Sequence, residues 1–224
     1  EQVWATTPWL RTTPEVAAHP SVWLCDNLDA PLLDHLHELY LEHDGSAVRT
    51  AVIVSPYYDR DAAAFDALLD RFMPKQIRVC LDPEDSGLDP HAFRSVLNRY
   101  AVDCAIERID ASNRRLHAKS LVLQTERGTW AISGSANFSR QALLRPAASG
   151  NTEAVVVRFE PDPSHFAEWL NELTTHPVDL DTLPEARPNN PEPARESIPI
   201  RLRSAILEGN ELRLQTEPSL SKDA

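Results

Sequence analysis

The run at residues 50–55, Thr-Ala-Val-Ile-Val-Ser, constrains the fold of this chain more than any other segment. Its near-continuous apolar, β-branched character is typical of a strand that is buried on both faces of a sheet. Such a sheet needs a covering layer on each side, so we expect an α/β protein with helices that sandwich the sheet. Residues 56–59, Pro-Tyr-Tyr-Asp, follow directly at the carboxyl end of the strand, where ligands gather in folds of this kind.

Strand and helix patterns alternate along most of the chain. Further strands are expected at residues 22–25, 76–81, 103–109, 117–123, 130–133 and 153–159. Helices are expected at residues 31–42, with Asn27 or Asp29 as a cap, at 61–72, 89–100 and 165–174, and as a short turn from Ser139. This alternation predicts a mixed, largely parallel β-sheet.

Composition divides the chain into four parts. Residues 1–20, rich in Thr and Pro, are expected to form an irregular arm, and residues 21–178 the α/β domain. Residues 179–199 are expected to form a Pro-rich linker. Residues 200–224 predict a β-hairpin, which either opens a further domain or caps this one. We interpret the chain, which begins without Met or a signal-peptide pattern, as a piece of a longer polypeptide.

Cysteine use and hydropathy indicate the compartment. Cys25, Cys80 and Cys104 are scattered and flanked by apolar residues, which favours reduced thiols in a cytoplasmic protein over a disulfide or a metal site. No apolar run approaches the roughly 18 residues of a membrane-spanning helix, so no membrane partner is expected.

Two polar stretches stand at the ends of expected strands. In residues 116–124, Leu-His-Ala-Lys-Ser-Leu-Val-Leu-Gln, strand alternation places His117 and Lys119 side by side on one face. A buried imidazole and ammonium without partners would be costly, so a binding site is favoured over a core strand, with a solvated edge strand as the alternative. Residues 134–139, Gly-Ser-Ala-Asn-Phe-Ser, are small and polar, which suits the close approach of an anion.

Together these stretches resemble the phospholipase D superfamily, whose signature is HxK(x)4D followed by GSxN. The resemblance extends to residues 150–153, Gly-Asn-Thr-Glu, where the family places another strand with an Asn and a Glu. Gln124 stands where the family has Asp. Residues 125–129 lengthen the separation of the two motifs, and we expect them in a hairpin loop.

The resemblance also implies a mechanism. In the family a His attacks phosphorus to form a phosphohistidine, which water resolves, and a second His protonates the leaving group, without a metal or another cofactor. His117 would be the nucleophile or the acid, and Lys119 would hold the phosphate charge. Ser135 and Asn137 would bind phosphate oxygens, and Glu153 would orient the imidazole. The supporting positions are Gln124, Ser133 and Asn151.

One His of this type makes only half of a site. His117 alone, among the eight His of the chain, has a Lys two residues further on. The resemblance therefore implies either a homodimer joined through the motif face or a second half-site elsewhere in the parent chain. We favour the symmetric homodimer, because the α/β part already makes a complete half-unit.

Charge is distributed unevenly. The net charge of −12 excludes a uniformly basic coat, but residues 105–145 hold seven Lys and Arg against three acidic residues, a net charge of +4. Such an island fits a focused anion site, with chance clustering on a solvated face as the alternative. The expected nucleic-acid contacts are Arg114, Arg115 and Arg140.

The function that we expect is a metal-independent nuclease, on DNA rather than RNA, within a larger DNA-processing or defence protein. One alternative is a catalytically weakened module that binds nucleic acid or dimerises, which Gln124 and the acidic surroundings favour. A phospholipase or phospholipid synthase is the second alternative. No metal site is expected, because the His residues lack metal-ligand spacing with Cys or carboxylates.

Overall fold

The computed structural model describes residues 21–82, 86–109, 116–162, 175–184, 201–208 and 211–217. The chain divides into two compact units, Glu1–Ala186 and Arg187–Ala224. The N-terminal arm expected at 1–20, the helix expected at 165–174 and most of the expected linker lie outside the described residues. In the second unit, β9 (Arg201–Glu208) and β10 (Glu211–Glu217) pair as an antiparallel hairpin.

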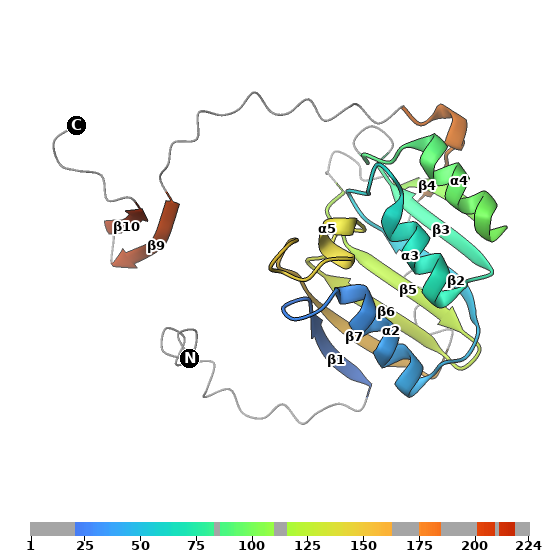
Figure 1. The fold of residues 1–224 in the computed structure, drawn as a ribbon, viewed down its shortest axis with the longest axis horizontal. Helices are drawn as coiled ribbons and strands as arrows, with labels where there is room; N and C mark the ends of the chain where they lie inside the picture. Colours follow the sequence, from blue (N-terminus) through green and yellow to red (C-terminus); the bar gives the residue numbers. More distant parts are fainter. Residues whose placement is uncertain are drawn as a thin grey trace. The chain divides into compact units, whose positions relative to one another are not determined.

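An eight-stranded mixed sheet organises the described part of the first unit (Figure 1). Its strands are β1 (Val22–Asp26), β2 (Val48–Val54), β3 (Gln76–Leu81), β4 (Asp103–Ile109), β5 (Ser120–Thr125), β6 (Thr129–Gly134), β7 (Ala154–Glu160) and β8 (Thr175–Pro177). Their order across the sheet is β1-β7-β6-β5-β2-β3-β4-β8. This order brings β5, β6 and β7, at whose ends the motif residues lie, next to one another.

The mixed sheet is confirmed, but the expectation that it is largely parallel is wrong. Three adjacent strands, β2, β3 and β4, run parallel to one another. All the other adjacent pairs in the sheet are antiparallel. The parallel trio is joined by helical crossovers, which parallel pairing requires. A short turn joins β5 to β6, and two strands joined in that way can pair only as an antiparallel hairpin.

The described helices lie together on one face of the sheet (Figure 1). They are α2 (Leu32–His43), α3 (Ala63–Phe72), α4 (Pro90–Tyr100) and α5 (Arg140–Leu143), followed late in the chain by the 3₁₀ turn η2 (Leu180–Thr182). As expected from the sequence, α4 begins at Pro90, where Asp89 accepts hydrogen bonds from two backbone N–H groups. The residue before α2 is Pro31, and neither Asn27 nor Asp29 caps that helix. No described helix has the length and apolar character needed to cross a bilayer.

Both faces of β2 are buried, as its sequence predicted. Ala51 and Ile53 point into the main core beneath the helices. Val52 and Val54 point to the opposite face, into a smaller cluster with Cys80. All three cysteines of the chain are unpaired.

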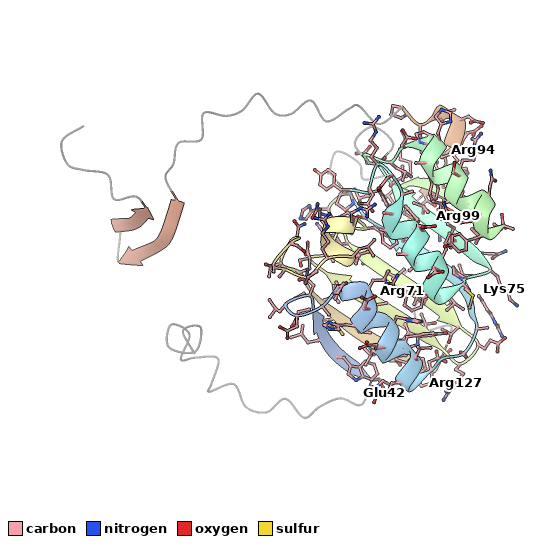
Figure 2. The ribbon with its side chains drawn as sticks, in the orientation of Figure 1. Glu42, Arg71, Lys75, Arg94, Arg99 and Arg127 are labelled. Carbon is pink, nitrogen blue, oxygen red and sulfur yellow. The ribbon has the colours of Figure 1, made fainter. Side chains whose placement is uncertain are left out.

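Ion pairs join neighbouring helices at the surface. Arg71 of α3 pairs with Asp34 of α2, and Arg99 of α4 pairs with Asp66 of α3. Figure 2 shows both arginines on the face of the sheet that the helices cover. Exposed pairs of this kind each contribute about 0–1 kcal/mol, so the buried apolar core dominates the stability of this layer.

Asp44 fastens α2 to the turn end of the β5–β6 hairpin. Its carboxylate accepts hydrogen bonds from Trp130 Nε1 at 2.9 Å, Thr125 Oγ1 at 2.8 Å and the Ser46 N–H at 3.2 Å. Trp130 is only 2% exposed. Burial by itself would raise the pKa of Asp44, but the hydrogen bonds outweigh it and hold the pKa below its ordinary value.

We therefore predict that Asp44→Asn lowers the free energy of unfolding at pH 7 by about 2 kcal/mol, because the amide cannot accept from all three donors. The pKa of Asp44 is lower in the folded than in the unfolded chain, so this stabilisation is present above the ordinary pKa of 3.8 and is lost as pH falls through the folded value. In urea unfolding from pH 7 to pH 3, the unfolding free energies of the wild type and Asp44→Asn should converge. The control Asp181→Asn, at an exposed ion pair, should change the unfolding free energy little. A difference in unfolding free energy between the wild type and Asp44→Asn that stays constant from pH 7 to pH 3 would contradict the lowered pKa of Asp44.

Candidate functional site

His117 and Lys119 lie immediately before β5, which begins at Ser120, so the expectation of a strand from residue 117 is wrong. The reason is that β2 ends at Val54, the partner of Ser120, and offers nothing further to pair with. The two side chains still lie together: Lys119 Nζ is 3.2 Å from His117 Nε2 and donates a hydrogen bond to the His117 carbonyl, also at 3.2 Å. His117 is exposed and Lys119 is half-buried.

The end of β6 is attached directly to Lys119. The Gly134 N–H donates to the Lys119 carbonyl at 3.4 Å, and Ser133 Oγ donates to the same oxygen at 3.3 Å. A Cβ at Gly134 would lie 2.2 Å from the Ala154 carbonyl oxygen. Only glycine therefore lets β6 approach β7 this closely at the point where the site begins.

Glu153 supplies a buried carboxylate just before β7. It is 6% exposed. Ser135 Oγ donates a hydrogen bond to its Oε2, and Asn151 Nδ2 donates to its Oε1 at 3.2 Å. Ser135 Oγ in turn accepts from the Ala154 N–H at 3.1 Å. Three of the residues singled out in the sequence thus form one network, while no hydrogen bond joins Glu153 to His117 within the described residues.

Asn137 lies in the same loop, two residues beyond Ser135. Its carbonyl accepts a hydrogen bond from the Ser139 N–H at 2.8 Å. Its side-chain Oδ1 is buried and has no hydrogen-bond partner among the described residues. A buried oxygen in this condition is costly, which suits an amide that gains partners when a ligand enters the site.

The residues after β2 hold this loop from the other side. Ser55 Oγ accepts from the Phe138 N–H at 3.0 Å, and the Asp59 carboxylate accepts from the Arg140 N–H. Burial raises the pKa of Asp59, although hydrogen bonds from the backbone N–H groups of Arg140 and Ala64 partly oppose the shift. The segment after the buried strand thus contributes support for the loop, where the sequence pattern had indicated only that a ligand would lie nearby.

Several expected site residues lie elsewhere. Gln124 pairs with Thr50 and Thr129 at the far end of β5, five residues beyond Lys119, which is roughly 16 Å along an extended strand. The Arg140 guanidinium pairs with Asp61 and lines an open cleft of about 580 Å³ together with Asp59 and Asp89. Arg114 and Arg115 lie outside the described residues.

Asn27 is the site residue that sequence reasoning missed. Expected as a helix cap, it is instead completely buried, and its side chain is hydrogen-bonded to the backbone of Asn151 and Glu153. The sequence did not reveal this role of Asn27, because its hydrogen-bond partners lie more than 100 residues away along the chain.

The arrangement combines four chemical elements at one edge of the sheet. An exposed imidazole provides a nucleophile or an acid, and an adjacent ammonium provides positive charge. Hydroxyl and amide groups provide hydrogen bonds, and a buried carboxylate orders them. Within the described residues no three His, Cys, Asp or Glu side chains form a group that could hold a metal ion. The chemistry of the group fits a reaction at an anionic centre.

Comparison with known proteins identifies a matching family and several similar solved structures. A family model described as "Cardiolipin synthase, PLD-like domain" matches residues 41–174, which is more than half of the chain. No curated protein sequence matches the chain.

Three solved structures are among those to which the chain is similar. The phospholipase D family member Nuc from Salmonella typhimurium shares 14% identity, with 71% of this chain and 100% of that chain covered and a TM-score of 0.44. NucT from Helicobacter pylori shares 16% identity over 67% of this chain and 91% of that chain, with a TM-score of 0.38. Yeast tyrosyl-DNA phosphodiesterase shares 12% identity over 61% of this chain and 31% of that chain, with a TM-score of 0.40. Likenesses at this level carry no argument about activity.

Proposed function

This chain belongs to the phospholipase D superfamily, and on that premise we propose that it is a metal-independent phosphodiesterase that cleaves DNA. The observation that carries the proposal is the contact of 3.2 Å between His117 and Lys119. An exposed imidazole beside a fixed ammonium can attack a phosphodiester while the positive charge offsets the charge that develops on the non-bridging oxygens.

The proposed reaction has two displacements at phosphorus. In the first, His117 Nε2 forms a bond to phosphorus as the bond to the leaving oxygen breaks, and a second imidazole protonates that oxygen. In the second, the second imidazole removes a proton from water as the water oxygen attacks phosphorus, and the nitrogen–phosphorus bond breaks, which frees His117 and returns the second imidazole to its protonated form. Lys119, Ser135 and Asn137 bind the phosphate oxygens in both steps. Glu153 acts through its hydrogen bond with Ser135.

The shape of the site supports a polymer as substrate. The cavity beside Lys119 holds only about 30 Å³, far below the roughly 300 Å³ at which ligand pockets begin. His117 is exposed and does not line this cavity, so a phosphodiester can reach it from the open surface, as a nucleic-acid strand would. The net charge of +4 over residues 105–145 also favours a polyanion.

The position of Gln124 supports catalysis over a module that only binds. Because Gln124 lies at the far end of β5, its replacement of the family Asp leaves His117, Lys119 and the loop after β6 intact. DNA binding without cleavage by the intact protein would instead support the catalytically weakened module.

We predict that the protein cleaves labelled DNA in excess EDTA, because its own imidazole and ammonium do what metal ions do in other nucleases. His117→Ala and Lys119→Ala should each abolish cleavage with little change in melting temperature, since removal of a partly solvated side chain leaves no large cavity. The matched control is Gln124→Asp, on the strand β5 that follows directly, whose rate should stay within about tenfold of wild type, equivalent to ~1.4 kcal/mol. Activity that is lost on chelation and restored by magnesium would contradict the mechanism.

We also propose that two copies of the chain complete the site. The reaction needs one imidazole to attack and one to protonate, and His117 is the single His followed by Lys two residues later. A two-fold axis through the motif face would bring the two copies of His117 together. A second half-site in the parent polypeptide is the alternative.

Mixing experiments test this assembly. When wild-type chains exchange with an equal amount of His117→Ala chains, only wild-type pairs should cleave DNA, so activity per total chain should fall to about one quarter rather than one half. A linear dependence on the wild-type fraction, or a monomer in sedimentation at concentrations that cleave DNA, would rule out the shared site.

A further inference from the structure

Asn27, which belongs to neither motif, makes five hydrogen bonds directly after β1. It is 0% exposed. Its Nδ2 donates to the carbonyls of Arg145 at 3.0 Å and Asn151 at 2.6 Å, and its Oδ1 accepts from the Glu153 N–H at 2.8 Å. Its backbone N–H donates to the Glu153 carbonyl at 3.3 Å, and its carbonyl accepts from the Ala147 N–H at 2.7 Å.

All of these partners belong to residues 145–153, the connection between α5 and β7. This connection contains no helix or strand, so the hydrogen bonds of regular structure do not fix its path. Asn27 holds both the N–H and the carbonyl of Glu153, the last residue before β7 begins. The backbone position of Glu153 therefore depends on Asn27 on one side and on β7 on the other.

The position of the Glu153 backbone decides where its carboxylate lies. That carboxylate is joined to Ser135 Oγ and, at 3.2 Å, to Asn151 Nδ2. Asn27 thus fixes the backbone of two of the three members of the network. A displacement of about 1 Å is enough to break such bonds and can cost about 100-fold in rate when it moves a reacting group.

We propose that Asn27 is a positioning residue of the active site. It holds the backbone of Asn151 and Glu153 so that the Glu153 carboxylate fixes the Ser135 hydroxyl. Ser135 directly follows Gly134, whose N–H is hydrogen-bonded to the Lys119 carbonyl. This role rests on the proposed phosphodiesterase function and is exerted through other residues, since Asn27 is buried away from substrate.

The chemistry of the position requires an amide. Two carbonyls need donors and one N–H needs an acceptor, and the short planar side chain of Asn supplies all three groups. Asn27→Asp keeps the acceptor but sets a carboxylate against the carbonyls of Arg145 and Asn151. Asn27→Ala removes all three groups and leaves buried polar atoms unpaired, which is destabilising.

A purely structural role makes a different prediction, and Asp44 provides the matched control. Asp44 is also a polar residue that accepts three hydrogen bonds, two of them from the distant Thr125 and Trp130, but it lies at the turn end of the β5–β6 hairpin. If Asn27 only stabilised the fold, Asn27→Asp and Asp44→Asn would each lower stability and leave the rate of the folded enzyme unchanged.

The test measures kcat and KM for DNA cleavage at a temperature where every variant is folded by circular dichroism. Asn27→Asp and Asn27→Ala should lower kcat by about 100-fold with KM within about threefold, whereas Asp44→Asn keeps the wild-type kcat. Adding Asn27→Ala to Glu153→Gln should cost no further rate, because both changes disable the same network. If Asn27→Ala does not fold, Asn27→Asp serves in its place. A wild-type kcat, or effects that multiply in the double variant, would overturn the role.

A second readout separates this inference from the function on which it rests. Amide hydrogen exchange should become faster at Ala147 and Glu153 in the Asn27 variant than in the wild type, while the amides of β2 and β3 keep their wild-type rates. If the wild-type protein cleaves no phosphodiester, the proposed function fails while this exchange result still supports the positioning. Unchanged exchange at both amides would overturn the positioning itself.

Discussion

The register in which β5, β6 and β7 meet is the constraint on which the site depends. The Gly134 N–H donates a hydrogen bond to the Lys119 carbonyl, and the Ser135 N–H donates to the Ala154 carbonyl at 3.1 Å. These backbone contacts bring three distant parts of the sequence to one edge of the sheet. A slip of one residue in either pairing would turn the neighbouring side chains to the opposite face. Gly134 protects the register, because any larger residue would collide with β7.

Polar anchors stand at both ends of this three-stranded group. At the site, Asn27 and the Glu153 network hold backbone that no regular element supports. At the other end, Asp44 ties α2 to Thr125 and Trp130. Each anchor satisfies several donors or acceptors at once, so the loss of one leaves buried polar groups unpaired. The two differ in purpose, because only the first carries residues of the proposed reaction.

Local patterns predicted much of the fold and of the site. The apolar run of β2 predicted a strand buried on both faces, and Asp89 with Pro90 predicted the start of α4. The motifs pointed to Ser135 and Glu153, whose side chains the structure joins by a hydrogen bond, and to Lys119, whose carbonyl accepts from the Gly134 N–H. The β5–β6 hairpin was expected, but the antiparallel pairing of β1 with β7 and of β2 with β5 was missed, since it joins strands that lie far apart in the sequence. Asn27 was missed for a related reason: its role depends on partners 118 to 126 residues away.

The central claim is that His117 forms a covalent bond to phosphorus during cleavage. The most direct test is a rapid-quench reaction of the protein with DNA under alkaline conditions that preserve a phosphorus–nitrogen bond, followed by peptide mass spectrometry. The account predicts a nucleotide adduct on the peptide that contains His117, which appears before product and decays as product accumulates, and which Glu153→Gln forms more slowly. Product formation with no adduct on His117, or an adduct on another residue, would contradict it.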